Sequence, residues 1–417
     1  TSKLSTQLIR CYVVSIHNTK ESSMRLGYKH TKADTQVNKY WDNTIVPLLN
    51  SGHLGHAITH KYIYPNRVGL YPGLNCQFFC HFCGRNYNAK YNPGIAGKSF
   101  DVFKRVIDED PRDRENWQDR FRISGGLEPL TNPHIGDIIQ YGTDNEFNMQ
   151  LYTNGYALTK KLLEKQPGLL NLEVMRVSVY GHNDQSYTNI TRIPKSFNMV
   201  KENLRNFLKQ NSNTKVGINW IILPGQSSDV VNVFDMIEDI NSTQDKKIQF
   251  ITLREDFSQS ALYLGDSERE QLIDIFQQVE EKCKTSDNLK HLHIDYGYQL
   301  DPIRHNNPSG PLTMVPYTKM NRYGFPQIAT AIDSLGNLYV YHETGFIERP
   351  GADRYIIGNI ENSNIADIVK QHVNGKGIVP KPFDVSFLDA FDHTISLVLS
   401  DTYMKNNWQE ILEQKWK

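Results

Sequence analysis

Cysteine is scarce in this sequence, and so are long apolar runs and any excess of charge. The 417 residues contain five cysteines, and 46 lysines and arginines balance 46 aspartates and glutamates. Five cysteines in a chain of this length do not make a disulfide framework, so we expect a reducing compartment, the cytoplasm. A chain without net charge has no general basic field, which argues against a nucleic-acid partner.

No apolar run approaches the roughly 20 residues that cross a membrane, so the sequence predicts no membrane association. The first residues, T-S-K-L-S-T, lack the positive segment and apolar stretch of a secretory signal, and we expect no signal peptide. The length allows one large domain with extensions or two modest domains.

Short β-rich segments alternate with amphipathic segments between residues 65 and 290. The six expected strands are Arg67–Tyr71, Arg120–Ser124, Asn148–Thr153, Met175–Tyr180, Lys215–Leu223 and Lys247–Arg254. The helix expected after the sixth strand opens with a Ser267-x-x-Glu270 capping box. Its apolar stripe consists of Leu272, Phe276, Val279 and Cys283. Because parallel strands need crossover connections, six such units predict an α/β fold, a partial (β/α)6 barrel two units short of a full one.

Two segments flank this expected barrel. Residues 1–64 carry a helical stripe and predict an N-terminal helical segment. The stripe consists of Trp41, Ile45, Leu48 and Leu49. Residues 291–417 predict a C-terminal α+β extension. There, Leu292–Tyr298 indicates a further strand, and the stretch 327–341 indicates a hairpin that turns at Leu335-Gly336-Asn337.

Three of the five cysteines lie within eight positions, in the stretch C-Q-F-F-C-H-F-C. Cys76, Cys80 and Cys83 follow the first expected strand, at the carboxyl end where barrel sites lie. Zinc usually takes four ligands, and a fourth ligand from the adjacent His81 gives awkward tetrahedral geometry. A [4Fe–4S] cluster held by three thiolates keeps one iron open for a substrate or cofactor. The spacing therefore favours an iron–sulfur cluster over zinc and over simple core packing.

The C-x3-C-x-Φ-C loop, with the aromatic Phe82 before Cys83, resembles the signature loop of the radical S-adenosylmethionine (SAM) superfamily. The six βα units are similar to that superfamily's partial barrel. The resemblance implies a [4Fe–4S] cluster whose open iron chelates the amino and carboxylate groups of SAM. Electron transfer from the reduced cluster then cleaves SAM to methionine and a 5′-deoxyadenosyl radical, while the protein positions the cofactors.

Further positions resemble the superfamily's SAM-binding motifs. The stretch S-G-G-L-E resembles the Gly-Gly-Glu motif, in which Gly125 and Gly126 allow close backbone approach and Glu128 can accept from the methionine ammonium. Ser178 ends the fourth strand at a position that often hydrogen-bonds SAM. By the same resemblance, the remaining expected cofactor contacts are Phe82, Asn154, Tyr180 and Leu223. A simple turn for the glycines and a strand-end hydroxyl for Ser178 stay open as alternatives.

The C-terminal hairpin and the later G-N-I segment resemble superfamily extensions that hold auxiliary clusters. In those extensions a cysteine follows the hairpin, and here Tyr341, His342 and Glu343 occupy that place. The scattered Cys11 and Cys283 cannot build a second cluster, and we expect both to be structural. The resemblance therefore implies the scaffold of the extension without its cluster, which frees these polar residues to meet the substrate.

Longer blocks resemble the sugar-nucleotide ammonia-lyases of the superfamily. They include S-G-G-L-E-P-L-T-N-P from Ser124, Y-T-N from Tyr152 and L-H-I-D-Y-G-Y from Leu292. The resemblance implies a nucleoside-diphosphate-linked deoxyamino sugar that loses hydrogen at carbon 3 and its carbon-4 amino group as ammonia, leaving a 3-keto dideoxy sugar. It also implies a flavodoxin or ferredoxin as electron donor, and we expect a homodimer.

A site for this substrate needs cations for the diphosphate and polar groups for the sugar. Arg254 and Lys90 are the candidate cations. The other candidates for sugar contact or catalysis are Glu255, Asp295, Tyr296, Tyr298 and Glu343. Ordinary polarity accounts for each residue equally well, for instance an ion pair of Arg254 with Glu255 or Asp256.

Some stretches depart from the ammonia-lyase pattern, namely Gly84–Lys90, Thr191–Lys195 and Ser258–Gly265. A related enzyme with the same frame could dehydrogenate or epimerise another sugar nucleotide, or act on another small molecule or a peptide. A non-catalytic scaffold fits poorly, because all three cysteines and the Gly-Gly-Glu-like segment remain.

Overall fold

The computed structural model describes residues 46–84, 90–255, 264–304 and 323–380, together with 387, 388, 391, 392, 395, 396 and 399. Its strands form one ten-stranded sheet in the order β10-β9-β8-β1-β2-β3-β4-β5-β6-β7. Seven neighbouring strands are parallel: β1 (Arg67–Tyr71), β2 (Phe121–Ile123), β3 (Gln150–Thr153), β4 (Val174–Val179), β5 (Lys215–Ile222), β6 (Phe250–Glu255) and β7 (His293–Asp295). The predicted partial barrel is thus confirmed, with β7 as a seventh parallel strand.

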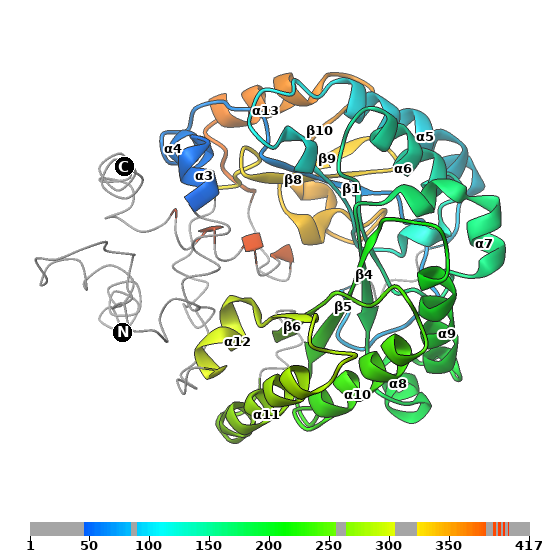
Figure 1. The fold of residues 1–417 in the computed structure, drawn as a ribbon. Helices are drawn as coiled ribbons and strands as arrows, with labels where there is room; N and C mark the ends of the chain where they lie inside the picture. Colours follow the sequence, from blue (N-terminus) through cyan, green and yellow to red (C-terminus); the bar gives the residue numbers. More distant parts are fainter. Residues whose placement is uncertain are drawn as a thin grey trace, which may run out of the picture.

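Helices cover the outer face of this sheet (Figure 1). They are α5 (Pro93–Asp108), α6 (Ile135–Asp144), α7 (Lys160–Lys165), α8 (Asp184–Thr191), α9 (Ser196–Leu208), α10 (Asp229–Ser242) and α11 (Asp266–Thr285). Alternate strand residues on this face are fully buried against the helices: Leu70, Ile123, Leu151, Val177, Ile218 and Leu253. Because successive strand residues point to opposite faces, the residues between them lie on the other face, which we call the inner face.

The expected capping box of α11 is wrong by two residues. The helix begins at Asp266, and the backbone N–H of Gly265 donates to Glu268 at 3.4 Å. A carboxylate at the third helical position fills this role, so Glu268 takes it in place of Glu270. The expected apolar stripe is confirmed, since Leu272, Phe276, Val279 and Cys283 are all buried.

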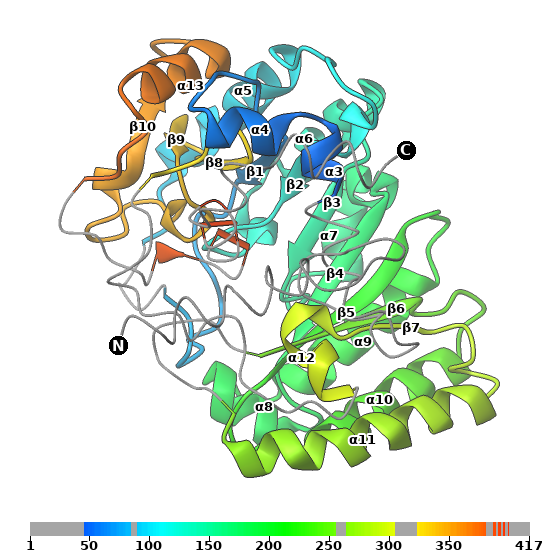
Figure 2. The same cartoon turned by 90° about the vertical axis from the view of Figure 1, so that its left-hand side faces the viewer.

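The C-terminal hairpin continues the same sheet on the side of β1 (Figure 2). Strand β8 (Ala329–Asp333) pairs in parallel with β1, and β9 (Asn337–Tyr339) and β10 (Ile356–Asn359) follow antiparallel. The Asp333 carboxylate holds the turn by accepting from the backbone N–H groups of Leu335 at 2.8 Å and Asn337 at 3.0 Å. The expected hairpin is therefore confirmed.

The segment Leu292–Tyr298 is a strand only in part. Strand β7 ends at Asp295, and α12 (Gly297–Arg304) begins after it. Gly297 has a φ of 58°, a left-handed conformation that a strand does not contain.

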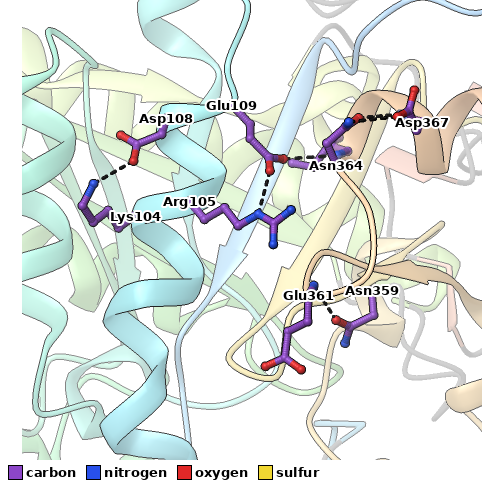
Figure 3. Close-up of polar contacts among 9 residues, drawn as sticks. Lys104, Arg105, Asp108, Glu109, Asn359, Glu361, Asn364 and Asp367 are labelled. Carbon is purple, nitrogen blue, oxygen red and sulfur yellow. Dashed lines mark hydrogen bonds and ion pairs between the residues drawn. The ribbon is translucent and has the colours of Figure 1, made fainter.

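The extension also contacts α5 through polar groups (Figure 3). The Glu109 carboxylate accepts from the backbone N–H of Ile365 at 3.3 Å, and Arg105 donates to Glu109 at 2.7 Å. Ile365 is the first residue of α13 (Ile365–Asn374), and the side chain of Asn364 caps that helix. An anion at a helix N-terminus is stabilising, so this contact attaches α13 to α5.

The remaining described elements are short. They are α3 (Val46–Asn50), α4 (His53–Ile58), η3 (Trp117–Asp119), η4 (Pro129–Thr131), η5 (Pro167–Asn171), η8 (His342–Thr344) and η9 (Asp353–Tyr355). Of the expected N-terminal stripe, Leu48 and Leu49 are buried, whereas Trp41 and Ile45 lie outside the described residues. The division of the chain at residues 64 and 290 stays a prediction. None of the helices in the described ranges has the length and apolar character to cross a membrane.

Candidate cluster and cofactor site

The signature cysteines lie in the loop after β1, as the sequence predicts for a site at the carboxyl edge of the sheet. Cys80 is buried, and Cys76 and Cys83 are half-buried. The backbone N–H of Cys83 donates to the carbonyl of Cys80 at 3.0 Å, which makes a tight turn between these two cysteines. The Cys76 sulfur accepts from the side-chain amide of Asn154 at 3.4 Å, so the loop also contacts the end of β3.

Aromatic rings surround the base of this loop. The buried ring of Phe78 lies 5.4 Å from Tyr156 and 5.9 Å from Tyr187, and Phe82 lies 5.7 Å from Tyr180. Burial, and then the neighbouring Cys83, raise the pKa of the Cys80 thiol well above its ordinary value. Cys80 is therefore a thiol unless a metal binds it, and metal binding must release its proton.

Glu128 is buried and accepts hydrogen bonds from its own loop and from the end of β3. Its donors are the backbone N–H of Leu130 at 3.1 Å, the Thr153 hydroxyl at 2.5 Å and the backbone N–H of Asn154 at 2.7 Å. The carboxylate thus ties the loop after β2 to the end of β3 and positions Asn154 beside Cys76. Its expected contact with the SAM ammonium stays a prediction.

The two glycines of the Gly-Gly motif allow close approach of aromatic rings. Gly125 has a φ of 114°, and a Cβ added there would lie 2.4 Å from the Tyr71 ring. A Cβ on Gly126 would lie 2.0 Å from the ring of Phe346, which belongs to the C-terminal extension. The segment 342–349 therefore packs onto the Gly-Gly loop, and this contact requires glycine at 126 independently of any cofactor.

Ser178, Tyr180 and Leu223 lie at the carboxyl ends of β4 and β5. Ser178 is on the inner face and accepts from the Asn219 side chain at 3.4 Å. Tyr180 follows β4 directly, and the buried Leu223 follows β5. The structure therefore brings these residues to the same sheet edge as the cysteine loop, while their roles toward SAM stay predictions.

Two sequence candidates point away from the inner face. Glu255 forms a buried ion pair with Arg269 of α11, with both carboxylate oxygens 2.7 Å from one guanidinium nitrogen. The Tyr296 hydroxyl donates to Glu280 of α11 at 2.9 Å, and its ring packs on Phe276. Both side chains thus contact α11, and their expected roles toward the substrate stay predictions. Arg254 and Glu255 are neighbours on one strand, so only one of them can face inward.

Arg254 is on the inner face and exposed. The alternative ion pair with Glu255 is absent, and Asp256 lies outside the described residues. Asp295, at the end of β7, accepts from the backbone N–H of Gly297 at 3.0 Å. Lys90 is exposed.

The candidates after the hairpin differ in burial. Tyr341 is buried and its hydroxyl donates to the carbonyl of Tyr323 at 3.1 Å. The backbone N–H of the buried His342 donates to Asp392 at 2.9 Å. Glu343 keeps 41% of its side chain exposed, 4.0 Å from Arg349. Tyr298 belongs to α12, and its side chain lies outside the described residues.

The sequence expectations missed three residues of the inner face, namely Arg122 on β2, Tyr152 on β3 and Arg176 on β4. Tyr152 and Arg176 are direct partners in the register of the two strands. An arginine within an apolar strand was the available signal, but the face it occupies follows only from the pairing of the strands.

The donors in the cysteine loop fit a [4Fe–4S] cluster. Within the described ranges, no three His, Cys, Asp or Glu side chains converge on a site for a single metal ion. A cluster spreads its thiolate ligands over different irons, so it suits three cysteines spaced along one loop. The amide of Asn154 on the Cys76 sulfur is the kind of outer contact that orients such a ligand.

Comparison with known proteins agrees with this geometry. Residues 70–237 match the family model described as the radical SAM superfamily. The chain is 36% identical over 381 residues to dTDP-4-amino-4,6-dideoxy-D-glucose ammonia-lyase of Streptomyces venezuelae, an alignment that covers 89% of this chain and 77% of that protein. It is also 37% identical over 75 residues to the AdoMet-dependent heme synthase of Methanosarcina barkeri (strain Fusaro / DSM 804), covering 18% of this chain and 21% of the relative.

Solved structures show the same fold at low sequence identity. Streptococcus suis SuiB bound to its precursor peptide SuiA aligns with a TM-score of 0.52 at 12% identity, covering 88% of this chain and 74% of SuiB. Native anSMEcpe with bound AdoMet aligns with a TM-score of 0.51 at 13% identity, covering 83% of this chain and 99% of that structure. The chain belongs to the radical SAM superfamily, whose enzymes use a [4Fe–4S] cluster and SAM.

Proposed function

We propose that this enzyme is a carbon–nitrogen lyase that eliminates ammonia from a nucleoside-diphosphate-linked 4-amino-4,6-dideoxy sugar. The observation that carries the proposal is the 36% identity to the Streptomyces venezuelae ammonia-lyase, which extends over 89% of this chain. The similarity reaches from the signature loop into the extension, and therefore covers the surroundings of a substrate as well as those of the cofactors. Low-identity structural neighbours show the fold alone and favour no second activity.

The residues of this chain would hold the cofactors and shield them from water. Cys76, Cys80 and Cys83 would bind the cluster, and Gly125 and Gly126 would let the backbone approach SAM. When bound and reduced, these cofactors supply the 5′-deoxyadenosyl radical that takes hydrogen from the sugar. The aromatic rings below the loop and the Phe346 ring above the Gly-Gly motif would exclude water from this region and so protect reactive species from side reactions.

The same proposal includes the cellular setting. The enzyme would work in the cytoplasm as a homodimer and take electrons from a flavodoxin or ferredoxin. The absence of a disulfide framework supports a reducing compartment, and the donor follows from family analogy.

Anaerobic turnover tests the activity. The reconstituted full chain is incubated with SAM, a reductant and dTDP-4-amino-4,6-dideoxy-D-glucose, and ammonia, 5′-deoxyadenosine and the sugar product are measured. We expect substrate-dependent ammonia and a 3-keto-4,6-dideoxy sugar nucleotide. A product that retains its nitrogen would instead indicate a dehydrogenase or an epimerase.

Two cysteine variants provide a matched control. Cys80→Ala removes a proposed cluster ligand and should abolish SAM cleavage and lower the iron content. Cys283→Ala changes a buried cysteine on the apolar stripe of α11 and should leave both unchanged. Full SAM cleavage by Cys80→Ala would contradict the proposed site.

A further inference from the structure

Four guanidinium groups gather on the inner face of the sheet. The register pairs Arg122 of β2 with Gly69 of β1, and Arg176 of β4 with Tyr152 of β3. The Arg176 guanidinium lies 5.1 Å from the centre of the Tyr152 ring and donates to the Gln150 side chain at 3.2 Å. We call the four the inner-face arginines: Arg67, Arg122, Arg176 and Arg254.

Three of these arginines lack a carboxylate partner within the part of the chain that the structure describes. Among the described residues no Asp or Glu forms an ion pair with Arg122, Arg176 or Arg254. In contrast, the buried Arg120 lies 2.5 Å from Asp110, and the buried Arg269 lies 2.7 Å from Glu255. These two buried arginines are thus paired with carboxylates, whereas Arg122, Arg176 and Arg254 are not.

Arg122 shows the imbalance most clearly. Its Nε is buried and has no hydrogen-bond partner among the described residues. Burial, and then the charge of Arg67, lower the pKa of its guanidinium to about 9. Arg122 is half-buried, and a buried Nε without a partner is costly, so this arginine points to an anionic ligand that completes it.

The pKa of the Tyr152 phenol reflects the positive charge of the inner-face arginines. Burial alone would raise the pKa of its phenol, yet the pKa lies below the ordinary value because the four inner-face arginines stabilise the phenolate. A neutral phenol between these cations can also donate a hydrogen bond to an anion that binds there.

The position of the group suits a substrate that extends from the cofactor loop. Tyr152 precedes Asn154 by two residues, which corresponds to roughly 7 Å along a strand. Asn154 contacts Cys76, so the inner-face arginines begin about one sugar ring away from the cluster loop. Arg254 lies nearer the carboxyl edge, on the opposite side of β5 from Arg176.

We propose that Arg122 and Arg176, with Arg254 nearer the carboxyl edge, bind the diphosphate of a nucleoside-diphosphate ligand on the inner face. This inference rests on the substrate class proposed above and adds to it the residues that recognise its anionic part. Guanidinium groups bind phosphate oxygens in a bidentate manner, and the low-polarity surroundings strengthen each contact.

Calorimetric binding of dTDP to the cluster-loaded full chain tests this inference, with pyrophosphate and neutral thymidine as comparison ligands. Arg122→Gln and Arg176→Gln should each weaken dTDP binding by about ten- to hundredfold, because each loses a charged hydrogen bond. Their affinity for SAM should be retained. Arg205→Gln is the control, because Arg205 of the outer helix α9 pairs with Asp239 of α10, and this variant should bind dTDP like the unmodified chain.

The outcomes separate this inference from the proposed activity. Unchanged dTDP affinity in both variants would overturn the inference, even if the enzyme releases ammonia from the sugar nucleotide. Failure of the unmodified chain to bind dTDP or pyrophosphate would also overturn it. Loss of dTDP affinity in the variants, without ammonia from any sugar nucleotide, would support the diphosphate site and refute the deaminase activity. Thermal unfolding and iron content of each variant, with Arg122→Met as a volume-conserving second variant, show that an affinity loss is not a folding defect.

Discussion

The side chain of Asn154 links the cysteine loop to the sheet. Its amide donates to the Cys76 sulfur at 3.4 Å, and its backbone N–H donates to Glu128 at 2.7 Å. Glu128 in turn is fixed by Leu130 and Thr153. The buried Glu128 carboxylate does not itself contact Cys76, but by holding the Asn154 backbone it determines where the Asn154 side-chain amide lies. Sequence motifs identify Asn154 and Glu128 as site residues, but this connection between them appears only in the fold.

Replacing Asn154 should change the reduction potential of the cluster. A hydrogen bond to a ligand sulfur stabilises the more negative reduced form, so Asn154→Ala should lower the potential. A net hydrogen bond of about 1 kcal/mol corresponds to about 40 mV for one electron. Redox titration followed by electron paramagnetic resonance measures this shift. Asn171→Ala, which removes an amide that donates to Gln140 far from the cysteine loop, is the matched control. Equal potentials in Asn154→Ala and the unmodified chain would refute the role.

Packing between elements explains why glycine stands at position 126. The loop after β2 and the extension segment 342–349 meet where the Phe346 ring lies against the Gly126 backbone. A methyl group at this position would lie 2.0 Å from the ring, closer than any real contact allows. The same position belongs to the expected SAM-binding motif. Packing of Phe346 and close approach of the cofactor therefore both require glycine at position 126.

The variant Gly126→Ala should therefore destabilise the protein by forcing Phe346 out of place. We expect a loss of about 1–3 kcal/mol in the free energy of unfolding, measured anaerobically with urea. Gly97→Ala is the matched control, because a methyl group on this helical residue of α5 would meet nothing within 4 Å. It should stabilise the helix by up to about 1 kcal/mol.

A second change distinguishes the cause. Phe346→Leu in the Gly126→Ala background should recover part of the lost stability, because the smaller side chain makes room for the methyl group. Equal stability of Gly126→Ala and the unmodified chain would show that the contact is not tight in solution.

Local patterns predicted the elements of this fold better than their mutual placement. The strand Arg67–Tyr71 was predicted with its exact bounds, because apolar residues and flanking Pro65 and Pro72 delimit it. Pairing of β8 with β1 could not be predicted, since more than 250 residues separate these strands and no local period encodes such a contact. The sequence also did not predict that Arg122 lies on the inner face of the sheet and Glu255 on the outer face, because the face that a residue occupies depends on strand register.

At the scale of the whole molecule, the extension and the barrel share one sheet. Five residues of β8 pair with β1, and β8 occupies the edge that β1 would otherwise expose. The hydrophobic core that contains Leu70 and Ile123 also contains Ile332, Leu338 and Ile368 from the extension. Because the barrel and the extension share a sheet and a core, we expect that the barrel does not fold stably without the extension.

A chain shortened to end at Arg304 tests this continuity. Removing β8, β9, β10 and α13 would expose the edge of β1 and the apolar face that packs on α13, and exposed strand edges promote aggregation. We therefore expect the shortened chain to aggregate, or to lose cooperative unfolding and iron binding, when it is examined by size-exclusion chromatography, circular dichroism and iron analysis. A monodisperse shortened chain that unfolds cooperatively and retains its cluster would show that residues 65–290 are an independent folding unit and that the extension serves the substrate alone.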